Sequence, residues 1–221
     1  MAEARIEIET DGPYRVHGVA LSRTAQIETD HGEPIDWEPE TPVPTDADPY
    51  EVCRCGRTAT QPLCDRLGCE SGFDGTEVAD RGPRAARAYP YRGAGFEMSD
   101  DLTICSRAGY CGDRSTTVWA MLGESDDDAV RARLRQMVML CPSGRLEYRA
   151  DGNTEPDELE HPAAVSAIRN GPLWVRGGVP VVGSDGAPYE VRHRVTLCRC
   201  GGSENKPFCD GTHELDGFRD G

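Results

Sequence analysis

The sequence predicts a small, β-rich α+β protein in which two similar units flank a different module. The first observation is an internal repeat, because residues 11–65 and 170–210 carry the same short motifs in the same order. The second is composition, since 37% of the 221 residues are hydrophobic, 6% are aromatic, and 25 glycines and 16 prolines supply turns. The third is that the ten cysteines fall into three sequence groups. Small cores and many turns are expected of such a chain.

The charge of the chain argues against two classes of partner. The formal net charge is −15, and Lys206 is the only lysine. Nucleic acids and anionic membranes both bind basic faces, so neither is an expected partner. No apolar run approaches the length of a spanning helix, and residues 1–10 lack the apolar stretch of a signal peptide. We expect a cytoplasmic protein that binds neither nucleic acid nor membrane.

The N-terminal unit is expected at residues 1–80. Its repeat motif GPYRVHGVAL lies at 12–21, and the alternating residues 25–29 are typical of a short strand. The proline-rich residues 38–50 predict an extended surface connection. The unit then reaches the loop CRCGRTATQPLCDRLGCESGFDG, here called the N-terminal ligand loop. Its four cysteines are Cys53, Cys55, Cys64 and Cys69.

A linker at 81–98 and then a middle module at 99–150 are expected next. Cys105 and Cys111 lie near the start of this module, and Cys141 near its end is followed by Pro142. Residues 125–140 predict a helix, because the acidic start suits the positive end of the helix dipole and the apolar residues form one stripe. The proline ends this helix and directs the third thiolate toward the first two.

A second linker at 151–162 leads to the C-terminal unit at 163–221. The motif GPLWVRGGVP at 171–180 repeats the one at 12–21, and residues 189–197 again predict a strand. The unit ends in LCRCGGSENKPFCDGTH, at 197–213, here called the C-terminal ligand loop. Each unit therefore consists of short strands followed by a cysteine-bearing loop.

The C-terminal ligand loop has the spacing of a metal site. Cys198 and Cys200 point to the same side of an extended segment. Cys209 and His213 lie on one face of a helical turn. Cysteines grouped in this way in a cytoplasmic protein are expected to bind metal rather than form disulfides. Zinc and iron both accept three thiolates and one imidazole, so spacing alone leaves both open.

This loop resembles the CDGSH iron–sulfur domain, whose pattern is C-x-C-x2-(S/T)-x3-P-x-C-D-G-(S/A/T)-H. Every position of the pattern is present, including Ser203, Pro207, Asp210, Gly211 and Thr212. The resemblance implies a [2Fe–2S] cluster with four ligands, with zinc as the alternative. The ligands would be Cys198, Cys200, Cys209 and His213.

The N-terminal ligand loop follows the same pattern as far as Asp65 and then departs from it. A glycine, Gly68, stands where the family has histidine, and Cys69 follows one residue later. A positive φ at Gly68 is expected to turn Cys69 inward. We expect an all-cysteine [2Fe–2S] site made by the four cysteines of this loop. The alternative is a degenerate site, empty or filled with zinc, in which Cys69 is a small buried hydrophobic residue.

In the middle module, ICSRAGYC and CPSGRLEY resemble the divergent single-cluster ferredoxin family, which carries C-x5-C and CPSG-x-L. The resemblance implies an iron–sulfur cluster bound by Cys105, Cys111 and Cys141. Three thiolates fit a [3Fe–4S] cluster. A [4Fe–4S] cluster whose fourth iron is open or takes a non-cysteine ligand is the first alternative, and a structural zinc is the second. The remaining histidines lack metal-ligand spacing and are expected at the surface or in turns. They are His17, His31, His161 and His193.

The function expected from these groups is electron transfer. No catalytic triad, phosphate loop or nucleotide fingerprint is visible, so we do not expect an enzyme with its own substrate chemistry. The imidazole of His213 replaces a negative thiolate and should give the C-terminal cluster the higher reduction potential. The expected partners are redox proteins. The alternatives are a cluster donor or redox sensor that serves apo-acceptor proteins, and a zinc-stabilised interaction module.

The resemblance also predicts how the units assemble. Single-domain CDGSH proteins pair two units across a two-fold axis. We therefore expect a monomer whose two CDGSH-type units form an internal pseudo-dimer with pseudo-two-fold symmetry. A small ferredoxin-like module with one helix would be inserted between them in sequence.

Overall fold

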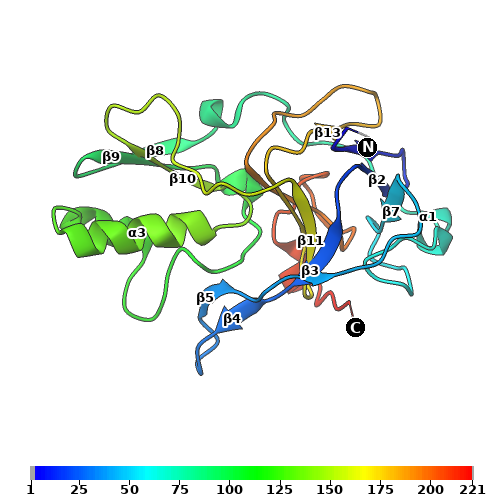
Figure 1. Cartoon of the computed structure of the whole chain (residues 1–221), viewed down its shortest axis with the longest axis horizontal. Coiled ribbons are helices and arrows are strands. Elements are labelled where there is room, and N and C mark those ends of the chain that lie inside the picture. Colours follow the sequence, from blue (N-terminus) through cyan, green and yellow to red (C-terminus); the bar gives the residue numbers. More distant parts are fainter. Residues whose placement is uncertain (1–2, 221) are drawn as a thin grey trace.

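The computed structural model describes residues 3–220, and short strands predominate in it (Figure 1). Two sheets formed by the N-terminal and C-terminal units lie on one side of the molecule. A third sheet and helix α3 (Asp128–Leu140) lie on the other side. The result is a β-rich α+β protein, as the composition predicts.

Two sheets each contain strands from both ends of the chain. Their strand orders are β13-β1-β2-β7 and β14-β12-β11-β3-β6. The strands are β1 (Arg5–Ile8), β2 (Tyr14–His17), β3 (Leu21–Thr24), β6 (Thr41–Pro42), β7 (Tyr50–Val52), β11 (Ala164–Ile168), β12 (Leu173–Arg176), β13 (Val181–Val182) and β14 (Arg194–Leu197). The strands predicted at 25–29 and 189–197 are present as β4 (Gln26–Glu28) and β14. Residues 38–49 contain only the two-residue strand β6, and β7 begins at Tyr50.

Each unit contributes to the other's sheet, the N-terminal unit with β3 and β6 and the C-terminal unit with β13. Strand β13 of the C-terminal unit pairs in parallel with β1, so that Ile6 lies opposite Val181. Strand β3 of the N-terminal unit pairs in parallel with β11, so that Leu21 lies opposite Val165. The β-branched and aromatic residues of both sheets face one shared core. Neither unit therefore completes its sheet without the other.

The third sheet belongs to the middle module and has the order β10-β9-β8. Its strands are β8 (Tyr89–Gly93), β9 (Phe96–Asp100) and β10 (Leu146–Ala150). Helix α3 covers one face of it, and α2 (Val118–Met121) packs beside α3. Residues 89–98 are therefore strand rather than linker. Their alternation of larger apolar and polar side chains, as in Phe96 and Met98, buries one face against α3.

The predicted helix of the middle module begins three residues later than expected, at Asp128. Asp127 caps it, because its carboxylate accepts hydrogen bonds from the Ala129 and Val130 amides at 2.7 and 3.2 Å. Ser125 instead ends the short 3-10 helix η3 (Leu122–Glu124). The other 3-10 helices are η1 (Arg84–Ala86) and η2 (Leu102–Ile104).

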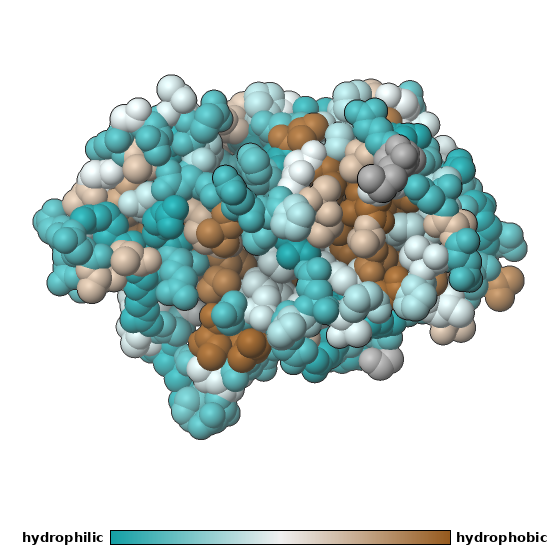
Figure 2. Space-filling view, in the orientation of Figure 1, coloured by the Kyte–Doolittle hydropathy of each residue, from teal (hydrophilic) through white to brown (hydrophobic). Residues whose placement is uncertain are grey.

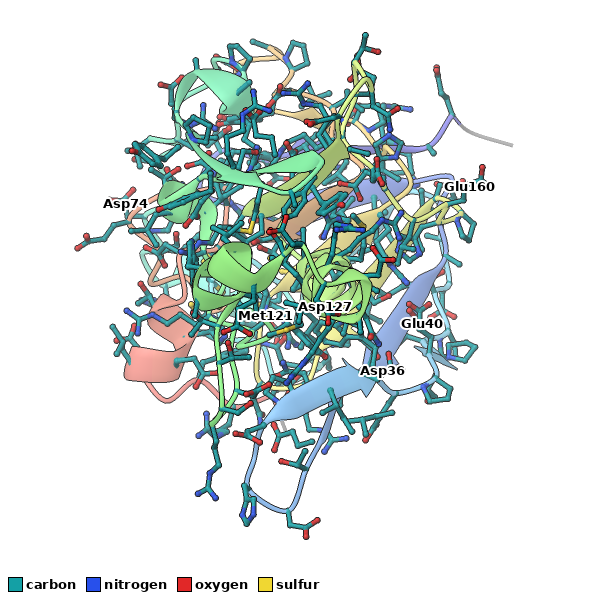
Figure 3. All side chains as sticks on the ribbon, turned by 90° about the vertical axis from the view of Figure 1, so that its left-hand side faces the viewer. Asp36, Glu40, Asp74, Met121, Asp127 and Glu160 are labelled. Atoms are coloured by element: carbon teal, nitrogen blue, oxygen red, sulfur yellow. The ribbon has the colours of Figure 1, made fainter. Side chains whose placement is uncertain are left out.

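A hairpin of the N-terminal unit reaches the middle module. It consists of β4 (Gln26–Glu28) and β5 (Pro34–Trp37). Trp37 Nε1 donates to the Leu140 carbonyl at 3.2 Å, and the Tyr110 hydroxyl donates to the Asp36 carbonyl at 2.7 Å. Figure 3 shows Asp36 on this hairpin, below α3, with Asp127 at the start of that helix. The hairpin thereby holds the end of α3 and the segment that precedes Cys111.

The surface is mostly polar. Figure 2 shows that hydrophilic residues cover most of the visible face and that hydrophobic residues gather in narrow bands. Within residues 3–220, the helices are all too short or too polar to traverse a bilayer.

One histidine expected at the surface is buried. His17 is 7% exposed, and its Nε2 lies 3.1 Å from the Glu7 carboxylate. The two residues come from neighbouring strands, β2 and β1, so the buried imidazole has a polar partner that sequence spacing does not reveal.

Candidate metal centres

The C-terminal ligand loop brings its four predicted ligands together as two close pairs. Cys198 and Cys200 follow β14, and their Sγ atoms lie 3.8 Å apart. Cys209 lies across the loop, and its Sγ is 3.4 Å from Nδ1 of His213 on helix α4 (Thr212–Leu215). Cys198, Cys209 and His213 are at most 5% exposed. Both predicted pairs are close in space, but Cys198 and Cys200 lie just beyond β14 and Cys209 precedes α4, so the loop rather than one strand or one helical turn brings them together.

Asp210 and its neighbours determine the shape of this loop. The Asp210 carboxylate accepts hydrogen bonds from the amides of Thr212, at 3.0 Å, and Glu204, at 2.8 Å. Burial opposes its ionisation, but these hydrogen bonds hold the pKa of Asp210 below its usual value. Gly211 has φ 88° and donates its amide to Cys209 Sγ at 3.4 Å. The aspartate and glycine between the third cysteine and the histidine thus orient both ligands.

The first pair of cysteines is poised to bind metal at neutral pH. A hydrogen bond from Cys198 lowers the pKa of Cys200 to about 7. The same contact, together with burial, raises the pKa of Cys198. One thiolate of the pair is therefore accessible near pH 7, and thiolate is the form that binds metals. In the N-terminal ligand loop, Cys53 likewise lowers the pKa of Cys55.

The N-terminal ligand loop is built in the same way. Cys53 and Cys55 Sγ lie 3.8 Å apart, and Cys64 and Cys69 Sγ lie 4.0 Å apart. Asp65 accepts from the amides of Ala59, at 2.9 Å, and Leu67, at 3.1 Å, as Asp210 does in the other loop. The loop then turns into the short helix α1 (Leu67–Glu70). All four predicted ligands of this loop are thus brought together.

Arg66 occupies the position that Gly211 holds in the other loop. Its φ is 62°, a left-handed value unusual for arginine. Its guanidinium pairs with two carboxylates, donating to Glu9 Oε1 at 2.9 Å and to Glu51 Oε2 at 2.8 Å. These contacts hold the residue in a conformation that glycine would adopt without strain.

The predicted positive φ at Gly68 is wrong, because Gly68 lies inside α1. What the glycine supplies is space. A Cβ atom at Gly68 would lie 2.7 Å from Cys55 Sγ and 2.8 Å from Arg57 Cβ. The helix can therefore approach Cys55 closely, which brings the sulfur of the next residue, Cys69, within 4.0 Å of Cys64 Sγ.

Replacing Gly68 by alanine is expected to destabilise the N-terminal site by about 1–3 kcal/mol, because the added methyl overlaps the Cys55 sulfur. Metal bound by the N-terminal site should fall while that of the C-terminal site is unchanged. Metal content and thermal unfolding measure this. Gly123→Ala is the matched control, since nothing lies within 4 Å of a Cβ at Gly123. Equal behaviour of the two variants would contradict the role given to Gly68.

The three cysteines of the middle module line one small cavity together with Ser143 and Arg145. Cys141 follows α3 with φ −64° and ψ 113°, so the helix ends there, as Pro142 predicts. Arg145 Nη1 donates a hydrogen bond to Cys105 Sγ at 3.1 Å. Within residues 3–220, the lining of this cavity includes no fourth cysteine and no histidine.

The three ligand regions touch one another through the C-terminal ligand loop. Gly56 packs against the Cys200 carbonyl, and a Cβ at Gly201 would lie 2.7 Å from the Cys55 carbonyl oxygen. On the other side, the Asn205 side chain donates to the Thr103 carbonyl at 2.9 Å. The stem of Arg107 packs against Gly211. The C-terminal ligand loop thus lies between the other two.

The donor sets fit iron–sulfur clusters. Two thiolates on one tetrahedral metal lie about 3.8 Å apart when each metal–sulfur bond is about 2.3 Å. The Cys53–Cys55 and Cys198–Cys200 separations have this value, 3.8 Å in each case. Each ligand loop therefore offers two pairs of donors, which suits a cluster of two irons. In the described range 3–220, no three His, Cys, Asp or Glu side chains are arranged to hold a single metal ion.

The sequence analysis missed several residues that support these loops. Arg54 and Arg199, between the paired cysteines, are 0% and 1% exposed, and Arg145 contacts the middle cysteines. The Tyr14 hydroxyl of the N-terminal unit donates to the Cys198 carbonyl at 2.8 Å. The only available signal was the repeated CRC motif, in which both copies place an arginine between two ligands.

Comparison with known families agrees with both resemblances. The model of the iron-binding zinc finger of CDGSH type matches residues 11–67 and 170–214. The model of a divergent 4Fe-4S mono-cluster domain matches residues 91–151. No curated protein and no solved structure matches the chain. The chain therefore carries two copies of the CDGSH-type iron-binding unit with a divergent 4Fe-4S mono-cluster domain between them.

Proposed function

We propose that this iron–sulfur protein is an electron carrier with three clusters. Two [2Fe–2S] clusters would be held by the N-terminal and C-terminal ligand loops, and a [3Fe–4S] or [4Fe–4S] cluster by Cys105, Cys111 and Cys141. When bound, such clusters accept and release single electrons. The ligands in the N-terminal ligand loop would be Cys53, Cys55, Cys64 and Cys69. Those in the C-terminal ligand loop would be Cys198, Cys200, Cys209 and His213.

The observation that carries this proposal is the contact of all three ligand regions through the C-terminal ligand loop. The glycine contacts at Gly56 and Gly201 bring the backbones of the two CDGSH-type loops together. The contact of Arg107 with Gly211 brings the middle loop against the same C-terminal loop. An electron entering at either outer site would reach the other through the C-terminal site. The histidine ligand gives that central site the higher potential, so electrons would tend to rest there.

Burial favours electron transfer over cluster donation. Cys209 is 3% and His213 is 5% exposed, and both are the expected ligands of one iron. An acceptor protein must reach the ligands to take a cluster, whereas electrons cross a few layers of protein atoms. The expected partners are therefore redox proteins.

The exchange of strands supports an internal pseudo-two-fold arrangement of the CDGSH-type units. The N-terminal unit contributes β1, β2 and β7 to one sheet and gives β3, with the short β6 at its edge, to the other. The C-terminal unit contributes β11, β12 and β14 and gives β13 in return. Reciprocal contacts of this kind are the mark of a two-fold interface. With that interface made within the chain, the protein would be a monomer, and a solution mass of one chain tests this.

Iron, acid-labile sulfide and zinc per chain, measured on anaerobically purified protein, test the cluster assignment. About seven irons would indicate two [2Fe–2S] clusters and one [3Fe–4S] cluster, and about eight would indicate a [4Fe–4S] cluster in the middle module. Reduction by a low-potential one-electron donor should bleach the visible spectrum, and air should restore it. Zinc without sulfide, or about two irons with zinc elsewhere, would contradict the electron-carrier proposal.

A further inference from the structure

Arg145 is placed to act on the middle site without being one of its ligands. It directly precedes β10 and lines the cavity of Cys105, Cys111 and Cys141. Its Nη1 donates to Cys105 Sγ at 3.1 Å, and its side chain is 13% exposed. A guanidinium keeps its positive charge in proteins, so this hydrogen bond brings a cation to a ligand sulfur.

Two neighbours hold this guanidinium in place. Asp100, at the end of β9, accepts from Nε at 2.6 Å and from Nη2 at 2.9 Å, which leaves Nη1 for the sulfur. The Asp100 side chain is 9% exposed. The ring of Trp119 lies 5.2 Å from Cζ of Arg145. A bidentate pair fixes the orientation of an arginine, so the contact with Cys105 is an organised one.

This contact differs in kind from those at the other ligand sulfurs. Three of them accept backbone amides, namely Cys64, Cys200 and Cys209, from Arg66, Gly202 and Gly211 at 3.3 to 3.4 Å. Cys141 Sγ lies 3.5 Å from the neutral Ser143 hydroxyl. Among the side-chain contacts of residues 3–220, a cationic group donates to cysteine sulfur only at Cys105.

We propose that Arg145 raises the reduction potential of the middle cluster through its charged hydrogen bond to Cys105. This inference rests on the proposed function and gives a role to a residue outside the ligand set. One-electron reduction by a low-potential donor breaks and forms no bond and adds one negative charge at the site. Arg145 stabilises that added charge, and hydrogen bonds to ligand sulfur are among the factors that set cluster potentials.

Replacing Arg145 by methionine tests the proposal, because methionine keeps an apolar stem and removes both charge and donor. The midpoint potential of the middle cluster, followed by electron paramagnetic resonance during a redox titration, should shift to a lower value. The potentials of the two [2Fe–2S] clusters in the same molecule should stay unchanged. Arg145→Lys, which keeps the charge without the bidentate geometry, should give an intermediate potential.

Arg149→Met is the matched control. Arg149 lies on β10 and pairs with a β9 carboxylate, Glu97, at 2.7 Å, but it makes no sulfur contact. Its removal should leave the potential of the middle cluster at the wild-type value.

Three outcomes would overturn the proposal. The first is an Arg145→Met potential equal to that of Arg149→Met. The second concerns the case in which Arg145→Met does not retain the middle cluster. The Arg145→Lys variant is then measured, and a middle-cluster potential equal to the wild-type value would contradict the role proposed for Arg145. The third is loss of the middle cluster in both Arg145 variants but not in Arg149→Met, which would assign Arg145 to assembly of the site. A wild-type protein without a third cluster would instead contradict the proposed function itself, and the iron count distinguishes that case.

Discussion

Replacing Arg199 by methionine is expected to lower the free energy of unfolding by about 3–5 kcal/mol, as for other broken buried ion pairs. The side chain of Arg199 is 0% exposed, and its Nη1 donates to Asp220 Oδ2 at 2.6 Å. Asp220 is also buried, and once Arg199 is replaced its remaining cationic partner is Arg23, which lies 3.6 Å away and is 40% exposed. The carbonyls of Gly171, at 2.9 Å from Nε, and Ile168, at 2.6 Å from Nη2, lose their donor as well.

The same substitution should release the C-terminal cluster before the rest of the protein unfolds. Arg199 lies between Cys198 and Cys200, and it ties that segment to the turn after β11 and to the chain end near Asp220. Denaturant unfolding followed by visible absorbance and by circular dichroism measures the two events separately. In the wild-type protein the two transitions should lie closer together.

Arg169→Met is the control for the Arg199 substitution. Arg169 pairs with Glu38 at 3.1 Å, but the two side chains are 59% and 46% exposed. An exposed pair contributes at most about 1 kcal/mol, so this variant should unfold nearly as the wild type does. A loss in Arg199→Met no larger than in Arg169→Met would show that the buried pair does not hold the loop. Adding Asp220→Asn to Arg199→Met should recover part of the loss, because it removes a buried carboxylate that only the half-exposed Arg23 would still pair with.

Local patterns predicted the ligand pairs of the two CDGSH-type loops well, because each pair is encoded within a few residues. The pairs Cys198–Cys200 and Cys209–His213 were predicted from the periodicity of strand and helix. Both pairs are close in space, although the loop forms them outside β14 and, for Cys209, before α4. The helix before Cys141 was predicted from its stripe and its proline. The start of the helix was predicted too early, because Ser125, a good N-cap residue, instead ends the 3-10 helix η3.

Long-range pairing could not be predicted in the same way. The exchange of β3 and β13 joins strands far apart in sequence, and a strand of two to four residues carries no signal that identifies its partner. The repeat indicated two similar units but not that each completes the other's sheet. Residues 89–98 looked like linker because of their glycines, although Phe96 and Met98 are fully buried in the module core.

The Gly68 prediction failed for an instructive reason. Glycine was expected to act through backbone freedom, yet it acts by lacking a side chain next to Cys55. The residue with positive φ is Arg66, although arginine rarely adopts that conformation. The carboxylates of Glu9 and Glu51 hold its side chain in place. Such compensation is a tertiary effect and is invisible in the sequence of the loop alone.

Replacing His213 by cysteine is expected to lower the reduction potential of the C-terminal cluster by on the order of 100–300 mV, because a thiolate adds negative charge where the imidazole is neutral. The potentials of the two [2Fe–2S] clusters, measured in one redox titration, should then nearly coincide. His31→Cys is the control, since His31 is exposed and belongs to no ligand loop. An unchanged difference between the two potentials would show that His213 is not a ligand.

The N-terminal ligand loop supplies a second design for the same test. Gly68 and Cys69 occupy the positions of His213 and Glu214, as the second and third residues of α1 and α4. The double variant His213→Gly with Glu214→Cys therefore copies an arrangement that already brings a sulfur within 4.0 Å of Cys64 Sγ. If the single variant loses its cluster because cysteine is too short, the double variant should retain it at low potential. A double variant that binds two irons at the wild-type potential would contradict the assignment of the histidine as the source of the higher potential.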